Sequence, residues 1–155
     1  MNATTLNLLR ELSSSNIVFR VNAAKELGKT GDREVVPALI KATEDSNHVV
    51  RDNAAFALGE LGDSRAIGSL VKLLKDEHPW VRKSSAKALG LLRDSRAIPA
   101  LGQMVNDPEP LVKRAAVRSL GQIGGPSAKQ YVEPFFNDAS FMVKEKAREA
   151  LKNLG

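Results

Sequence analysis

The chain repeats itself with a fixed period of 31 residues. One leucine recurs at this interval without any insertion, at Leu27, Leu58, Leu89, Leu120 and Leu151. The motif around it is clearest in Val81–Gly90, where a valine–arginine pair is followed by small residues and then by leucine and glycine. A constant period of this size is typical of arrays in which each repeat contacts only its neighbours. The chain is therefore predicted to form one continuous repeat array.

Each repeat contains two helical patterns. In the range 49–61 and again in the range 64–75, apolar residues recur at helical spacing. Gly62 is expected to end the first helix and Asp63 to cap the second. The turns are only a few residues long, so neighbouring helices are expected to run antiparallel. We predict an all-α fold, a right-handed α-solenoid of about ten antiparallel helices in helical-hairpin repeats.

The period also divides the chain into units. We expect a single domain over residues 1–155, made of an N-terminal half-repeat, four full repeats and a C-terminal half-repeat. The units are 1–16, 17–47, 48–78, 79–109, 110–140 and 141–155. In the last unit, Arg148 and Lys152 replace the alanine or valine and the glycine of the other repeats, as expected of a cap whose outer face meets water.

Several positions constrain the backbone. A glycine recurs inside the first helix of each repeat, at Gly28, Gly59, Gly90 and Gly121. Glycine costs about 0.5–1 kcal/mol relative to alanine in a helix, so its repetition indicates close contact with an adjacent helix. Arg93 stands where another repeat has glycine, and a left-handed conformation there would be unfavourable. Pro37, Pro99 and Pro134 are expected to bend the second helices.

Composition narrows the possible functions. The chain has no cysteine, which excludes disulfides and thiolate chemistry, and no apolar run long enough to cross a membrane. Its first residues do not resemble a signal peptide, so we expect a cytoplasmic protein. The net charge is +5, and the basic excess lies in the C-terminal half. That excess fits either a solvated surface or an acidic partner or nucleic acid.

The repeated string, clearest in the ranges 50–70 and 81–101, resembles the HEAT-like repeat of the phycobilin lyase family. It is similar also to artificial α-helical repeat scaffolds. The resemblance implies that the Val-Arg helices line a concave face and the other helices form the convex back. Members of this family act as protein-binding scaffolds, as chaperone-like subunits for bilin attachment and as the diiron enzyme deoxyhypusine hydroxylase, and related folds bind DNA.

The enzyme branch does not fit these residues. The diiron hydroxylases carry His-Glu directly after the Val-Arg pair, and the corresponding positions here hold other residues: Val21-Asn22, Asp52-Asn53, Lys83-Ser84, Arg114-Ala115 and Glu145-Lys146. His48 and His78 fall in turns before the helices, outside those columns, so no metal site is expected. We find no Gly-rich phosphate loop and no nucleophile motif, and we therefore expect no catalysis and no cofactor.

The positions that vary most between repeats identify a candidate binding surface. They share one sector of the Val-Arg helices, which the resemblance places on the concave face. The predicted partner-binding residues are Phe56, Trp80, Lys83, Lys87, Leu91, Leu111, Arg114 and Arg118. One column of this sector is apolar throughout, and Trp80 in it either packs under the preceding turn or forms an exposed apolar centre with a charged border.

The favoured function is a non-catalytic scaffold or adaptor, expected to be monomeric, whose concave face binds a partner protein that is acidic and has apolar anchors. One alternative is a chaperone-like or lyase-type subunit for bilin attachment, which would need a second subunit. Another is nucleic-acid binding through the basic half, with Trp80 and Phe56 for stacking. Asp52, Glu60, Glu145 and Glu149 share the face and make nucleic acid the less favoured partner.

Overall fold

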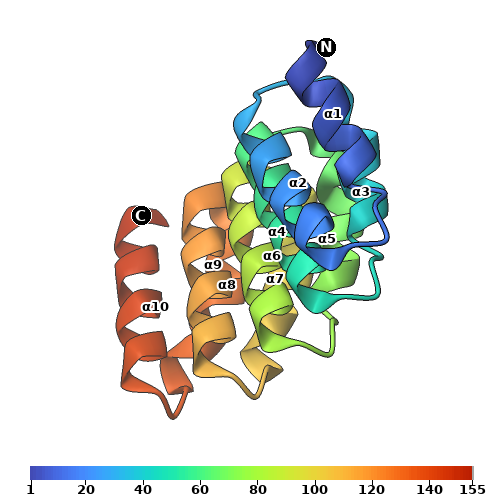
Figure 1. The fold of residues 1–155 in the computed structure, drawn as a ribbon. Coiled ribbons are helices and arrows are strands. Elements are labelled where there is room, and N and C mark those ends of the chain that lie inside the picture. Colours follow the sequence, from blue (N-terminus) through green and yellow to red (C-terminus); the bar gives the residue numbers. More distant parts are fainter. Residues whose placement is uncertain (155) are drawn as a thin grey trace.

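The computed structural model describes residues 1–154, and this part of the chain folds into ten α-helices with no strand. The helices stack in chain order, with the two termini at opposite ends of the array (Figure 1). Those that carry the Val-Arg motif are α2 (Ile17–Lys29), α4 (His48–Leu61), α6 (Pro79–Leu92), α8 (Pro110–Ile123) and α10 (Phe141–Leu154). The helices between them are α1 (Ala3–Glu11), α3 (Val36–Ala42), α5 (Ile67–Leu73), α7 (Ile98–Gly102) and α9 (Pro126–Val132). The prediction of an all-helical solenoid with ten helices is confirmed.

The second helix of each repeat is shorter than the sequence predicted. The range 64–75 was expected to form one α-helix, but it begins as a 3₁₀ turn, Ser64–Ala66, and becomes α-helical only in α5. The other 3₁₀ segments are Arg33–Val35, Ser95–Ala97, Gln103–Asn106 and Glu133–Asn137. Pro37 and Pro99 lie at the start of α3 and α7, where the missing N–H is not needed, and Pro134 lies inside a 3₁₀ segment. The prolines therefore coincide with changes of helix type.

The predicted turn residues adopt the expected conformations. Gly62 ends α4 in the left-handed region with φ of 63°, and the side chain of Asp63 accepts a hydrogen bond of 2.9 Å from the N–H of Arg65. Arg93 also has a positive φ, 51°, at the end of α6. It is the one non-glycine residue with positive φ in residues 1–154, and a side chain at such a position is strained.

The recurring glycines bring neighbouring even-numbered helices into backbone contact. A Cβ atom placed on Gly28 would lie 2.7 Å from the Cα atom of Ala57 in α4, and one on Gly59 would lie 2.8 Å from Cα of Ala88 in α6. No real side chain tolerates such distances, so the prediction of close helix contact is confirmed. We call this line of contacts the glycine–alanine seam. The even-numbered helices pack on one another along it more extensively than the shorter odd-numbered helices do.

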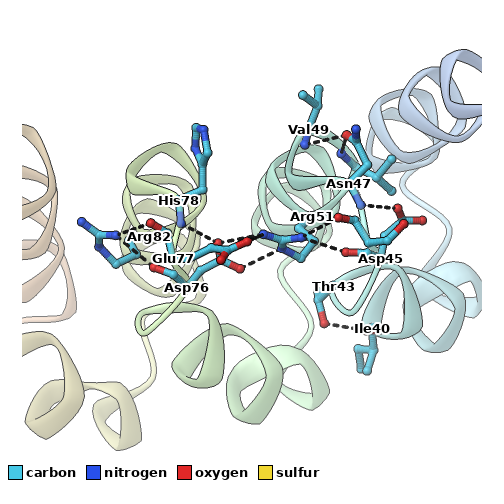
Figure 2. Close-up of polar contacts among 12 residues, drawn as sticks. Ile40, Thr43, Asp45, Asn47, Val49, Arg51, Asp76, Glu77, His78 and Arg82 are labelled. Atoms are coloured by element: carbon cyan, nitrogen blue, oxygen red, sulfur yellow. Dashed lines mark hydrogen bonds and ion pairs between the residues drawn. The ribbon is translucent and has the colours of Figure 1, made fainter.

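A ladder of ion pairs joins successive repeats on the edge where the even-numbered helices begin. In Figure 2, Arg51 reaches from α4 to Asp76, and its Nε and Nη2 atoms donate hydrogen bonds of 2.8 and 3.0 Å to the two carboxylate oxygens. The Nη1 atom of Arg51 also donates to the backbone oxygen of Asp45, at 2.9 Å. The four rungs of this ladder are Arg20–Asp45, Arg51–Asp76, Arg82–Asp107 and Lys113–Asp138.

The ladder carboxylates also organise the turns that hold them. Oδ1 of Asp76 accepts a hydrogen bond of 2.9 Å from the N–H of His78, which starts the next helix. Burial raises the pKa of Asp76, but hydrogen bonds from Arg51 and from the His78 backbone, together with the nearby positive charge, outweigh that effect and hold the pKa below its ordinary value. The same balance lowers the pKa of Asp45 and of Asp138. Each rung thus fixes both a turn and the packing of two repeats.

The two ends of the array differ in how they meet solvent. Arg148 and Lys152 on α10 are exposed, as predicted for a polar cap. At the other end, Glu26 of α2 occupies the seam position that holds Ala57 in α4, and it forms an ion pair with Lys29. Phe19 is half exposed, whereas Val50 in the equivalent position is fully buried.

None of the helices in residues 1–154 has the length and hydropathy that a membrane span requires.

Candidate protein-binding surface

A groove lies between α6 and α8 on the surface that the even-numbered helices present. We call this surface the even-helix face. The groove has a volume of about 180 Å³ and is lined by Lys83, Lys87, Leu111, Arg114, Ala115 and Arg118. Below it, the two helices are held together by the hydroxyl of Ser119, which donates a hydrogen bond of 2.7 Å to the carbonyl oxygen of Ala86. Five of the eight predicted partner-binding residues therefore line one depression with a firmly packed floor.

The four cations of the groove are arranged as two like-charged pairs. Lys83 and Lys87 are one helical turn apart on α6, and Arg114 and Arg118 are one turn apart on α8. None of the four is within ion-pairing distance of a carboxylate in the described part of the chain. Like charges at this spacing destabilise a helix by about 0.2–0.5 kcal/mol for each pair. Folding alone does not account for placing all four together.

Trp80 is exposed at the beginning of α6. Its relative accessibility is 53%, and Nζ of Lys83 lies 4.5 Å from the centroid of its ring. This cation–π contact holds the ring beside the groove. Of the two interpretations that the sequence left open for Trp80, packing under the preceding turn is therefore wrong, and exposure is correct.

The rest of the apolar column to which Trp80 belongs is exposed too. Each member stands at the second residue of an even-numbered helix, and all five point to solvent: Val18, Val49, Trp80, Leu111 and Met142. Isolated exposed apolar residues are ordinary on protein surfaces, but a contiguous apolar row marks an interaction surface. The row runs along the edge of the even-helix face and meets the cationic groove at Trp80 and Leu111.

Besides Trp80, which lies beside the groove, two other predicted residues lie outside it. Phe56 is exposed on α4, and Leu91 is exposed near the end of α6; neither lines the depression between α6 and α8. The Leu91 side chain leans towards α4, because its Cδ1 atom would lie 3.3 Å from a Cβ placed on Gly59. Both residues are available to a ligand that extends from the groove towards α4.

The histidines adopt an arrangement that the sequence analysis missed. His48 is the first residue of α4, not part of the turn, and His78 caps the start of α6. Their rings stack with centroids 3.8 Å apart and an interplanar angle of 9°. His48 and His78 do not occupy equivalent positions in successive repeats, because they are one position apart when the repeats are aligned. The repeat pattern therefore gave no reason to pair them. Across residues 1–154, no three His, Cys, Asp or Glu side chains gather as metal ligands would.

The arginine–aspartate ladder also went unrecognised in the sequence. Its signal was present, because the basic and the acidic members each recur at the 31-residue period. Two columns with the same period need not touch, however, and only the fold shows that Arg51 meets Asp76. The ladder matters for the site because it fixes the starts of α6 and α8, from which the groove side chains extend.

Comparison with known families agrees with this architecture. The model of the family described as HEAT repeats matches residues 5–87 and 68–152. The chain belongs to the HEAT-repeat family. No sequence among the curated proteins matches the chain.

Solved structures extend the comparison. The chain is similar to one in the complex of CpcE and CpcF of phycocyanin lyase from Nostoc sp. PCC7120, with 30% identity and a TM-score of 0.86; the match covers 99% of this chain and 66% of that one. This chain thus spans about two-thirds of the lyase chain's length. A designed armadillo repeat protein in complex with the peptide (KR)4 matches with 19% identity and a TM-score of 0.74, over 96% of this chain and 80% of that one.

Human deoxyhypusine hydroxylase matches more distantly, with 14% identity and a TM-score of 0.53, over 99% of this chain and 85% of that one. At this identity and at that of the armadillo protein, the likeness establishes the fold alone. The resemblance to the HEAT-like repeats of phycobilin lyases, and to artificial repeat scaffolds, is confirmed.

Proposed function

We propose that this chain is a non-catalytic interaction scaffold that binds a partner protein on its even-helix face. The observation that carries the proposal is the groove between α6 and α8, where four unpaired cations surround Leu111 beside the exposed ring of Trp80. An exposed aromatic anchor next to charged side chains is the usual composition of a protein-binding surface. The HEAT-repeat fold is suited to protein–protein interaction, and its rigid array supplies the platform.

The chemistry of the groove favours an acidic partner with apolar anchors. Carboxylates of the partner would relieve the repulsion between the two cation pairs, and the planar guanidinium groups of Arg114 and Arg118 can each donate two hydrogen bonds to one carboxylate. An apolar partner residue would cover Trp80, Leu111 and, towards α4, Phe56. The charged border would act mainly on encounter rate and orientation, and the apolar anchors mainly on affinity.

Two variants test this proposal in a binding assay with the partner captured from the source organism. We expect Trp80→Ala to weaken binding roughly thirtyfold, since truncating a tryptophan hot spot commonly costs about 2 kcal/mol or more. Arg114→Glu/Arg118→Glu should abolish capture of the same partner. Lys41→Glu/Lys75→Glu, a matched double reversal on the odd-helix side, should leave capture intact.

Denaturant unfolding of each variant is measured in parallel. Because the Trp80 ring is exposed, Trp80→Ala should change the free energy of unfolding by less than about 1 kcal/mol, whereas a buried tryptophan would cost about 3–5 kcal/mol. Retention of every partner by a folded Arg114→Glu/Arg118→Glu variant would refute the assignment of this surface.

A second candidate function is supported by the likeness to the phycocyanin lyase chain. In that case the chain would act as a chaperone-like subunit in bilin attachment, together with a second subunit. The test is to combine the chain, a bilin and an unliganded phycobiliprotein with and without candidate second subunits. A covalent, coloured product that requires this chain would favour the lyase role over the scaffold role.

A further inference from the structure

The sign of charge changes along the even-helix face from one repeat to the next. Two columns of equivalent positions cross this face, one turn apart on each helix. The first contains Asp52, Lys83, Arg114 and Glu145, and the second contains Phe56, Lys87, Arg118 and Glu149. Helices α6 and α8 are thus basic in both columns and α10 is acidic in both. Helix α4 has one acid and one aromatic residue in the same columns.

The acids of α10 lie beside the arginines of α8. Glu145 and Glu149 line a shallow groove between these two helices together with Arg114 and Lys146, and the Lys146 side chain is only 19% exposed whereas that of Glu149 is 61% exposed. Glu145 is held by Arg148 and Glu149 by Lys146. The hydrogen bond from Lys146, and then the positive charge of Lys146, Arg118 and Arg114, lower the pKa of Glu149, so the carboxylate is ionised at neutral pH. The boundary between basic and acidic surface therefore falls between α8 and α10.

The other end of the cationic groove is bounded by α4. Oδ1 of Asp52 is shielded from solvent and has no hydrogen-bond partner among residues 1–154. The Phe56 ring is exposed one turn further along the same helix. This end of the face thus has an aromatic surface, and its two columns lack the cations that would hold a further acid.

Building on the proposed function, we propose that the even-helix face binds an extended partner segment in a single register. The acidic residues of the segment lie over α6 and α8, its basic residues lie over Glu145 and Glu149 of α10, and an apolar residue lies against Phe56 of α4. Packed helices are spaced about 8–10 Å apart, and an extended chain advances about 3.3 Å per residue. About three residues of the segment therefore correspond to each helix, and the order along the array is apolar, acidic, acidic, basic.

The same pattern disfavours a uniformly anionic ligand. A nucleic acid strand or an all-acidic tail that filled the groove between α6 and α8 would continue over α10, where its charge meets two carboxylates. Like-charge juxtaposition at an interface opposes binding and suppresses wrong partners. The acidic end therefore sets both the length of the acidic run and the direction of the segment along the array.

Synthetic peptides test this register. The first peptide carries a leucine, a run of glutamates long enough to span two helices, and a run of lysines. The second replaces the lysines with glutamates, and a single-stranded oligonucleotide serves as a third ligand. Binding to the full chain is followed by fluorescence anisotropy at low salt, where exposed charges are least screened. We expect the first peptide to bind about fivefold more tightly than the second, because it gains two ion pairs with α10 and exposed ion pairs contribute modestly to affinity.

Substitutions in α10 reverse or remove that preference. In Glu145→Lys/Glu149→Lys the all-acidic peptide should become the better ligand, and in the milder Glu145→Gln/Glu149→Gln the two peptides should bind equally. Thermal unfolding checks that both variants are folded. Equal binding of the two peptides to the unmodified chain, or tighter binding of the oligonucleotide than of the first peptide, overturns the register.

The two proposals fail in different ways. If neither peptide binds, or if Arg114→Glu/Arg118→Glu leaves peptide binding unchanged, the binding surface itself is wrong, and the register falls with it. If binding depends on Arg114 and Arg118 but is the same with and without the lysine run of the peptide, the binding surface is correct and only the register is overturned.

Discussion

Two sets of cations lie side by side in this molecule and have opposite surroundings. Arg82 and Lys83 are adjacent in sequence, yet Arg82 is paired with Asp107 and its side chain is only 12% exposed, whereas Lys83 has no carboxylate partner in the described residues and lies over Trp80. Lys113 and Arg114 repeat the contrast on α8. A helix turns about 100° per residue, so a single step moves a side chain from the edge between repeats to the open face. Residue type alone does not separate a structural cation from a binding one, whereas pairing and burial do.

The largest effect should come from removing a ladder cation. Arg51→Met leaves the shielded Asp76 carboxylate and two backbone oxygens without their donor. Breaking such a pair on one side costs about 3–5 kcal/mol when it is buried, and we expect about 3 kcal/mol here because the side chains are slightly exposed. Guanidinium unfolding measures the loss. Lys83→Met, the matched change in the groove, should alter stability by less than about 0.5 kcal/mol; similar losses in both variants would remove the distinction.

Acid should weaken the ladder and spare the groove. The pKa values of Asp45, Asp76 and Asp138 are below their ordinary values in the folded state. Their contribution to stability is therefore fully present above the unfolded-state pKa, about 3.9, and is lost as pH falls through the lower folded-state values. The effect at Asp45 and Asp76 should be smaller than that of Arg51→Met, because Arg20 and Arg51 keep their hydrogen bonds to backbone oxygens.

Urea midpoints between neutral pH and about pH 2 measure this dependence. Asp76→Asn removes one of the titrating carboxylates and should flatten the acid limb of the curve. If that variant follows the unmodified chain throughout, the ladder does not contribute to acid stability.

Replacing Lys113 of the fourth rung with arginine should stabilise the chain modestly. Lys113 donates a single hydrogen bond, 2.6 Å long, to Asp138, whereas each arginine rung makes bidentate contacts and reaches backbone oxygens as well. We expect Lys113→Arg to raise the free energy of unfolding by about 1 kcal/mol, because a net gain of about that size is typical of one added intramolecular hydrogen bond. No gain in the thermal midpoint would show that the lysine already satisfies the site.

The smallest effect should come from relieving repulsion in the groove. Lys87→Gln removes one member of a like-charged pair, and we expect it to stabilise the unliganded chain by about 0.2–0.5 kcal/mol. The gain should shrink as salt is added, because the side chains are exposed. The same variant should bind the acidic peptide less tightly, which would show that stability and binding oppose each other at this position.

The fold could be predicted from the sequence because every repeat carries the same information. The apolar spacing predicts the helices, Gly62 predicts a helix end, and the seam glycines Gly28 and Gly59 predict close helix contact. Each of these predictions needs only the local sequence. The ladder could not be predicted, since the contact between Arg51 and Asp76 depends on how one repeat stacks on the next. The 3₁₀ turn over 64–66 was missed because apolar spacing does not distinguish a tight first turn from an α-helical one.

The candidate site was predicted in part for a similar reason. Variation between repeats identified Lys83, Lys87, Arg114 and Arg118, and the structure places them around one groove. Whether Trp80 is exposed depends on the path of the turn before α6, which no local pattern specifies. Phe56 and Leu91 share the sector but belong to the α4 side, and the distance between columns on neighbouring helices could be read only from the fold.

The glycine–alanine seam has a consequence for building with this chain. Gly28 meets Ala57 in the same way that Gly59 meets Ala88, so the contacts from α2 to α4 and from α4 to α6 have the same geometry and do not involve the variable residues of the even-helix face. Duplicating the repeat that contains Lys83 and Lys87 would therefore lengthen the basic surface by one helix spacing, whereas α10, which has Lys152 in place of the seam glycine, can stand only at the end of the array. The order of charges along the even-helix face can then be changed at its exposed positions without altering the core.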